Sequence, residues 1–203
     1  MQDNYLLQAD HARRAFLGYD LEAIARKCSL QQDGDWLIGT FFSEPFRISR
    51  TTGAIRRLHL GAWIPADSHG EVMTLLDLLC DSRETRHLSG QLQNMVSFGH
   101  QFHQSMNEDR KSPAALAFQA RPEALKAACE ALGGVPFSPG DVAYRIPVFE
   151  ELSITLQFFL GDEEFAPRLR YLWDRNALQY LKYETMYFAV DVLLSRIFEN
   201  FPQ

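Results

Sequence analysis

The chain has 203 residues, of which 46% are hydrophobic and 23% charged, and this balance excludes a disordered or low-complexity polymer. Its 20 basic and 26 acidic residues give a formal net charge of −6, so the basic excess that is typical of nucleic-acid-binding proteins is absent. We therefore expect one globular domain over residues 1–203 that has no nucleic-acid partner.

No apolar run approaches the roughly 20 residues that a membrane helix needs. Residues 1–10 include Asp3 and Asp10 and lack the apolar core of a signal peptide. These features predict a soluble, cytoplasmic protein without a membrane partner.

The N-terminal third predicts two helices followed by a small antiparallel meander. Apolar residues recur at helical spacing over 3–17, and Asp20 is a suitable N-cap for a second helix over 21–28. Residues 31–35 are polar and include a glycine, which predicts a turn. Runs of aromatic and β-branched residues or clean alternation then predict strands over 36–42, 46–50 and 54–58.

The clearest local signal is a capping box from Ser68 to Glu71. The apolar stripe behind it has helical spacing, and together they predict a helix over 69–81. Residues 92–98 predict a strand, and the polar segment 100–111 predicts a loop. The surrounding stretch 99–112 is the only weak candidate for a domain boundary.

Prolines open two further helices, at Pro113 and Pro122, because the missing N–H of proline does no harm in a first helical turn. The remaining patterns predict strands over 142–148, 152–160 and 168–173 and a final helix over 184–199. Helices and strands do not alternate as they do in a doubly wound fold. We therefore expect the α+β class, with a mostly antiparallel sheet, helices packed on one face and a C-terminal helix.

The three cysteines, Cys28, Cys80 and Cys129, are far apart and form no CxxC pair. A disulfide framework, a structural zinc site and a catalytic thiol are therefore all disfavoured. Each cysteine falls on or beside an apolar helix face, so we expect buried free thiols in a reducing cytosol.

Local motifs of the common enzyme classes are missing. The sequence has no glycine-rich phosphate loop, no GxSxG nucleophile elbow and no HExxH zinc motif. These absences favour a protein that is not an enzyme and has no cofactor, although they leave open a site assembled from distant residues.

His100 and His103 would share one face of a helix and could then hold a metal ion together. The segment predicts a loop, however, and no spacing demands a third ligand. We favour two solvated histidines and expect no metal site.

Four arginines gather in the predicted meander: Arg47, Arg50, Arg56 and Arg57. Alternation places Arg50 on the same side as Phe46 and Ile48, with Arg47 on the other side. A phosphate or an acidic ligand could bind such a patch. The favoured alternative is a hairpin edge that charge keeps soluble and unpaired.

The densest group of ionisable residues lies in the strand, turn and helix near the C-terminus. One interpretation is a ligand-binding pocket, and the favoured one is a set of turns fixed by ion pairs between acids and arginines. The candidate residues are Asp162, Glu164, Arg168, Asp174 and Glu184.

The same C-terminal stretch carries a resemblance, through the pattern GDEEF-x-PR…LWD…A…YL…E. It resembles the signature of an uncharacterised prokaryotic family, a domain of unknown function found largely in anaerobic bacteria and archaea. Residues 46–53 and 125–141 resemble further stretches of that family, so the likeness covers about residues 20 to 198. Some relatives carry an iron–sulfur cysteine segment that this chain lacks, so no cluster is implied. The family has no established activity, and the resemblance implies one coherent domain and no mechanism.

Two functions remain open from the sequence. The favoured one is a non-enzymatic binding or interaction module with an unknown protein or small-molecule partner. The alternative is a small enzyme or ligand sensor that uses a carboxylate and arginine pocket near 162–184. The aromatic content of 12% leaves a homo-oligomer possible.

Overall fold

The computed structural model describes residues 2–98 and 113–202. The chain forms two compact units, one of residues 1–87 with 178–192 and the other of residues 88–177 with 193–203. Each unit contains an antiparallel sheet of five strands, which confirms the predicted α+β class and antiparallel pairing. The loop and boundary predicted within 99–112 lie outside the described residues.

The sheet of the first unit is a meander in which every strand pairs with its neighbours in the chain. The three predicted strands are present and form its centre. Its strands are β1 (Gln31–Asp33), β2 (Trp36–Phe41), β3 (Glu44–Ser49), β4 (Ile55–His59) and β5 (Ala62–Pro65).

The two outer strands of this sheet differ from the sequence-based expectation. The turn predicted at 31–35 is wrong for its first part, because Gln31 pairs with Ile38 and Asp33 pairs with Trp36. The turn itself is reduced to two residues, and Gly34 adopts the positive φ of 56° that such a tight hairpin favours. Strand β5, which pairs with β4, carried no predicted strand signal.

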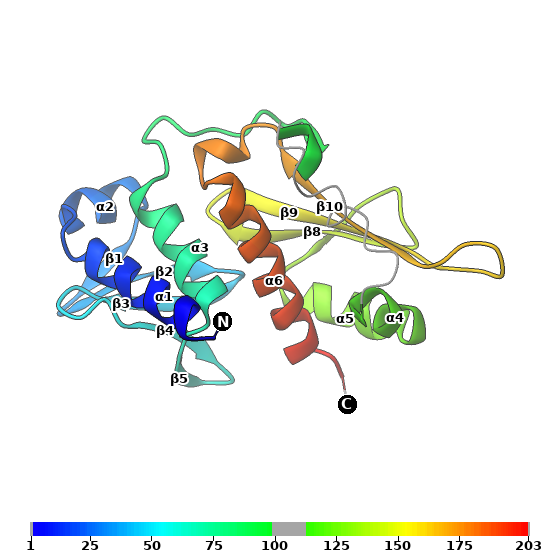
Figure 1. Cartoon of the computed structure of the whole chain (residues 1–203), viewed down its shortest axis with the longest axis horizontal. Helices are drawn as coiled ribbons and strands as arrows, with labels where there is room; N and C mark the ends of the chain where they lie inside the picture. Colours follow the sequence, from blue (N-terminus) through cyan, green and yellow to red (C-terminus); the bar gives the residue numbers. More distant parts are fainter. Residues whose placement is uncertain (1, 99–112, 203) are drawn as a thin grey trace. The chain divides into compact units, whose positions relative to one another are not determined.

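Four helical segments belong to the first unit: α1 (Gln2–Phe16), α2 (Leu21–Lys27), α3 (His69–Cys80) and the first part of α6 (Tyr183–Glu199). These helices were all predicted within one or two residues of their ends, and Asp20 accepts the Ala23 N–H as the expected cap of α2. Figure 1 shows α1 and α3 side by side next to the sheet. Strand β4 presents Arg57 to Glu71 of α3, so α3 lies over the face that buries Leu37 and Ile48.

The capping box at the start of α3 is confirmed. The Ser68 hydroxyl accepts the Glu71 N–H at 3.3 Å and donates to the Glu71 carboxylate at 2.8 Å. Behind it, seven of the helix residues from Val72 to Leu79 are buried. The cap therefore fixes the start of a helix that forms much of the core of its unit.

The sheet of the second unit has the order β6-β10-β9-β8-β7. Its strands are β6 (Leu92–Asn94), β7 (Val135–Pro136), β8 (Val142–Phe149), β9 (Leu152–Phe159) and β10 (Arg168–Asp174). The strand predicted over 92–98 ends at Asn94, and Met95–Phe98 form a 3-10 turn that buries Met95. The prediction was therefore wrong for the second half of this segment.

Helices α4 (Pro113–Ala120) and α5 (Pro122–Ala131) complete the second unit with the end of α6, and both begin at the predicted prolines. The Phe118 ring meets Phe158 of β9 edge-on at 5.9 Å and stacks on Phe198 at 5.4 Å. Trp173 of β10 is fully buried. Among the described residues, no helix combines the length and apolar character needed to cross a membrane.

Replacing Ser68 by Ala should lower the free energy of unfolding of the first unit by about 1 kcal/mol. The variant would lose the hydrogen bonds of the Ser68 hydroxyl to the Glu71 N–H and to the Glu71 carboxylate. Urea denaturation followed by circular dichroism measures the change. Ser68→Asn is the matched control, since asparagine also caps helices and should retain most of the stability. An alanine variant as stable as the wild type would show that the cap is dispensable.

Candidate functional site

Asp162 and Glu164 lie in an exposed turn before β10, and Arg168 is the first residue of that strand. The Asp162 carboxylate accepts the backbone N–H groups of Glu164 and Phe165, at 2.9 and 2.7 Å. The Glu164 side chain is exposed, and the Arg168 guanidinium lies 4.8 Å from the centre of the Phe159 ring. Figure 1 shows this connection as a long hairpin end that projects beyond the other strands of its sheet. Asp162 therefore organises its own turn.

Asp174 lies at the other end of β10 and is buried. One carboxylate oxygen accepts the N–H of Ser89, the Ser89 hydroxyl and the N–H of Asn176, and the other accepts the N–H of Gly90. Burial alone would raise the pKa of Asp174, but these four hydrogen bonds outweigh it and lower the pKa. Asp174 thus stabilises the loop before β6 and the turn after β10.

The five candidate residues are not brought into one pocket within the second unit. β10 rises by about 3.3 Å per residue, so Arg168 and Asp174 are separated by roughly 20 Å. Glu184 belongs to the first unit, where it is exposed in the first turn of α6. His100 and His103 lie outside the described residues, and within the described part no group of three or more His, Cys, Asp or Glu side chains could hold a metal ion.

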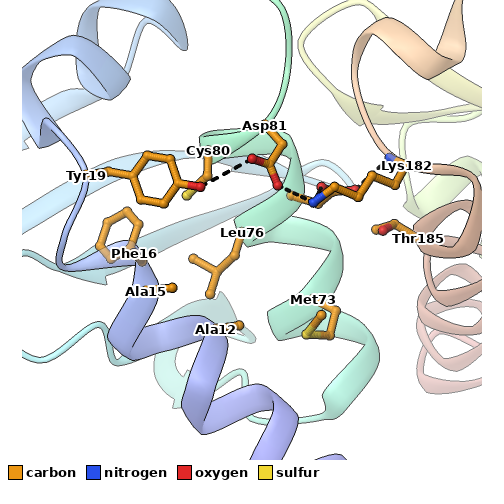
Figure 2. Close-up of a pocket in the computed structure, with 11 residues that line it drawn as sticks. Ala12, Ala15, Phe16, Tyr19, Met73, Leu76, Cys80, Asp81, Lys182 and Thr185 are labelled. Atoms are coloured by element: carbon orange, nitrogen blue, oxygen red, sulfur yellow. Dashed lines mark hydrogen bonds and ion pairs between the residues drawn. The ribbon is translucent and has the colours of Figure 1, made fainter.

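A different site appears in the first unit, between α1, the second half of α3 and the start of α6. It is a pocket of about 150 Å³. Figure 2 shows apolar side chains from α1 and α3 on one side and the polar groups Tyr19, Asp81 and Lys182 along another. The lining residues are Ala12, Ala15, Phe16, Tyr19, Met73, Leu76, Asp77, Cys80, Asp81, Lys182 and Thr185.

Asp77 is the buried charge of this pocket, with only 4% of its side chain exposed. Its Oδ2 accepts the backbone N–H of Lys182 at 2.7 Å. Its Oδ1 lies 3.2 Å from the Lys182 ammonium, yet it receives no donor in hydrogen-bonding geometry. Burial raises the pKa of Asp77 more than its contacts with Lys182 and Thr185 lower it.

Asp81 and Lys182 form the outer rim. Asp81 accepts hydrogen bonds from the Lys182 ammonium and, at 3.3 Å, from the Tyr19 hydroxyl. Burial alone would raise the pKa of Asp81, but its hydrogen bonds and the Lys182 charge lower it. The Asp81 carboxylate in turn raises the pKa of Lys182 and of Tyr19. Tyr19, Asp81, Lys182 and Asp77 are therefore linked to one another by hydrogen bonds and ion pairs, and among these contacts Asp77 Oδ1 has no donor in hydrogen-bonding geometry.

Cys80 is the only thiol in the pocket lining. Burial raises its pKa to about 12, and the neighbouring Asp81 carboxylate adds to this effect. The thiol is protonated at neutral pH, which is consistent with the expected inert role. All three cysteines are free thiols, and the expected burial holds for Cys28 and Cys129, whereas Cys80 is half-buried.

The sequence analysis did not select Asp77 or Lys182. The available signal was a single acid within the run Leu75-Leu76-Asp77-Leu78-Leu79, where every neighbour is buried. A carboxylate within such a run must find a partner, because an unpaired buried charge is strongly unfavourable. Its partner, Lys182, is 105 residues away in the chain.

A family model described as Domain of unknown function (DUF3786) matches residues 20–196. The chain belongs to this family. The DUF3786 match includes strands and helices of both units, and it contains Asp77, Asp81 and Lys182, whereas Tyr19 and α1 precede it. No curated protein and no solved structure matches the chain.

Replacing Asp174 by Asn should lower the free energy of unfolding of the second unit by about 2 kcal/mol at pH 7, because an amide nitrogen would oppose a backbone N–H. The pKa of Asp174 is lowered in the folded state, so its contribution is present above the ordinary pKa of about 3.9 and is lost as the pH falls below it.

Urea denaturation at pH 7 and at pH 3 tests this expectation. The difference in free energy of unfolding between the Asp174→Asn variant and the wild type should be smaller at pH 3 than at pH 7. Glu163→Gln in the same unit is the control, because that side chain is exposed and makes no hydrogen bond in the described structure. An equal difference at both pH values would contradict the assigned role of the carboxylate.

Proposed function

We propose that this DUF3786 protein is a non-enzymatic binding module, and that the pocket of the first unit binds a primary ammonium group carried on a short apolar chain. The pocket volume of about 150 Å³ suits a group of a few heavy atoms, such as one amino-acid side chain or a small amine. The partner is therefore a small organic amine or a basic side chain of another protein.

The charges of the lining support a cationic ligand. Two carboxylates, Asp77 and Asp81, face one ammonium, Lys182, so one negative charge is in excess. The more accessible apolar lining residues, Ala12, Ala15 and Met73, would contact the carbon chain of the ligand. A ligand with a charged head and an apolar body matches both parts of this surface.

The observation that carries the proposal is the state of Asp77 Oδ1. Buried carboxylate oxygens normally receive hydrogen bonds, and an oxygen without a donor is costly. Here Oδ2 accepts the backbone N–H of Lys182, whereas Oδ1 is buried without a donor in hydrogen-bonding geometry, 3.2 Å from the Lys182 ammonium, and Asp77 is one of the residues that line the pocket. A ligand ammonium would supply a hydrogen-bond donor to this carboxylate and would balance the one negative charge that Asp77 and Asp81 together leave in excess of Lys182.

Binding is favoured over catalysis because the groups that could act as nucleophiles are held protonated. The pKa of Cys80 is raised to about 12 by burial, and hydrogen bonding to Asp81 raises the pKa of Lys182. The alternative enzyme or sensor site near 162–184 has less support. Asp162 and Asp174 are already occupied by backbone N–H groups, as structural carboxylates are.

Titration of the isotope-labelled protein with n-butylammonium, followed by amide chemical shifts, tests the proposal. We expect saturable chemical-shift changes around α3 and the start of α6. The affinity for uncharged butan-1-ol should be at least about tenfold lower than that for n-butylammonium. Asp77→Asn should weaken n-butylammonium binding by about tenfold or more, because a charge-assisted hydrogen bond becomes a neutral one.

Two further variants make the result decisive. Asp81→Asn should also weaken binding, because it removes the second carboxylate of the pocket. This variant keeps the buried hydrogen bond between the Lys182 N–H and Asp77. Asp67→Asn is the matched control, because Asp67 is an exposed acid of the same unit that pairs with Arg13 at 2.7 Å. Unchanged affinity in both pocket variants, or no saturable binding to the wild type, would overturn the proposal.

A further inference from the structure

The four arginines of the first sheet divide into two pairs with different environments. Arg50 pairs with Glu22, and Arg57 is buried in contact with Glu44 at 3.0 Å. Arg47 and Arg56 are directly opposite each other on β3 and β4, on the face that points away from α3. The patch predicted from the sequence is thus reduced to Arg47 and Arg56.

The Arg47 guanidinium contacts two tryptophan rings. Its guanidinium carbon lies 4.3 Å from the centre of the Trp36 ring and 4.4 Å from that of Trp63. The rings come from β2 and β5, on either side of β3 and β4. Contact with two indole rings restrains the position of the guanidinium, whose N–H donors are then available for recognition of an acceptor.

No acceptor in the described structure satisfies this guanidinium. Arg47 makes no ion pair and no hydrogen bond to a described residue, and its Nε is buried without a partner. Arg56 is exposed, and its only described partner is the Trp63 backbone carbonyl at 3.4 Å. Two positive charges therefore share one surface with no carboxylate bound to either.

We propose that Trp36, Arg47, Arg56 and Trp63 form a carboxylate-binding site for an acidic peptide of a partner protein. A guanidinium presents paired N–H donors that match the two oxygens of a carboxylate. Because the two indoles already immobilise Arg47, binding costs little further side-chain entropy. This site lies on the other sheet face from the helices that form the amine pocket, and it does not depend on that pocket.

A peptide fits this face better than a nucleic acid does. Half-buried Ile38 and Leu58 lie on the same face as the arginines and would contact the aliphatic stem of a glutamate or a neighbouring side chain. A nucleic acid requires a track of basic residues along its phosphates, whereas this face offers two and the chain has a net charge of −6.

The test uses a fluorescein-labelled peptide of alternating Glu and Ala residues and its Gln counterpart, with fluorescence anisotropy at constant ionic strength. We expect the Glu peptide to bind saturably. The affinity for the Gln peptide should be at least about tenfold lower. Arg47→Lys keeps the charge but loses the planar fork, so it should weaken binding of the Glu peptide by about tenfold. Arg50→Lys is the matched control and should bind as the wild type does.

Intrinsic fluorescence gives a second readout, because Trp36 and Trp63 are two of three tryptophans and the third, Trp173, is fully buried in the other unit. The Glu peptide should change tryptophan emission in the wild type with the same midpoint as the anisotropy. Equal binding of the Gln peptide, equal binding by Arg47→Lys, or no binding to the wild type would overturn the proposal. Tighter binding of a single-stranded oligothymidylate than of the Glu peptide would overturn it in favour of a nucleic-acid surface.

Discussion

The buried carboxylate of Asp77 is the constraint on which the first unit depends. It lies in the last turn of α3, between leucines that pack into the core, and a charge in that position must be neutralised. The backbone N–H and the ammonium of Lys182 do this, at 2.7 and 3.2 Å. The contact ties residues that are 105 positions apart and fixes the start of α6 at the end of α3. This contact joins two of the three helical segments that line the pocket.

Polar groups in this protein differ in whether the fold satisfies them. Asp174 accepts four hydrogen bonds, and Asp162 accepts two from its own turn. By contrast, Asp77 Oδ1 and the Arg47 guanidinium lack hydrogen-bonding partners among the described residues. Native proteins leave few buried polar groups unsatisfied, and each exception calls for a reason. We propose that a ligand supplies the missing partner at these two sites, a cation at Asp77 and an anion at Arg47.

Much of the fold could be predicted from local sequence. The Ser68 cap and the apolar stripe behind it define α3, and strict alternation defines β9, because both signals depend on neighbouring residues only. Strand β1 escaped prediction since its three residues are exposed and polar, and only the hydrogen bonds to β2 make it a strand. Strand β5 is short and at the sheet edge, where propensity is a weak guide.

The candidate sites were harder to predict, for a physical reason in each case. The acids near the C-terminus are close in sequence, but β10 carries Arg168 and Asp174 apart and Glu184 belongs to the other unit. Asp77 looked like one polar residue in an apolar helix, and its partner follows only from tertiary packing. Alternation correctly placed Arg47 on the sheet face opposite to that of Phe46 and Ile48. The contact of Arg47 with Trp63 could not be predicted, because Trp63 belongs to the unpredicted strand β5.

The most direct measurement is the pKa of Asp77, read from its carboxyl carbon by NMR with and without n-butylammonium. In the free protein the pKa of Asp77 should lie above the ordinary value of about 3.9, because burial outweighs its contacts. Saturating n-butylammonium should lower that pKa, since a bound ammonium favours the carboxylate form. Two results would contradict the proposal that Asp77 accepts a hydrogen bond from a bound ammonium. One is a pKa of Asp77 at or below the ordinary value in the free protein, and the other is a pKa that does not change at saturating n-butylammonium.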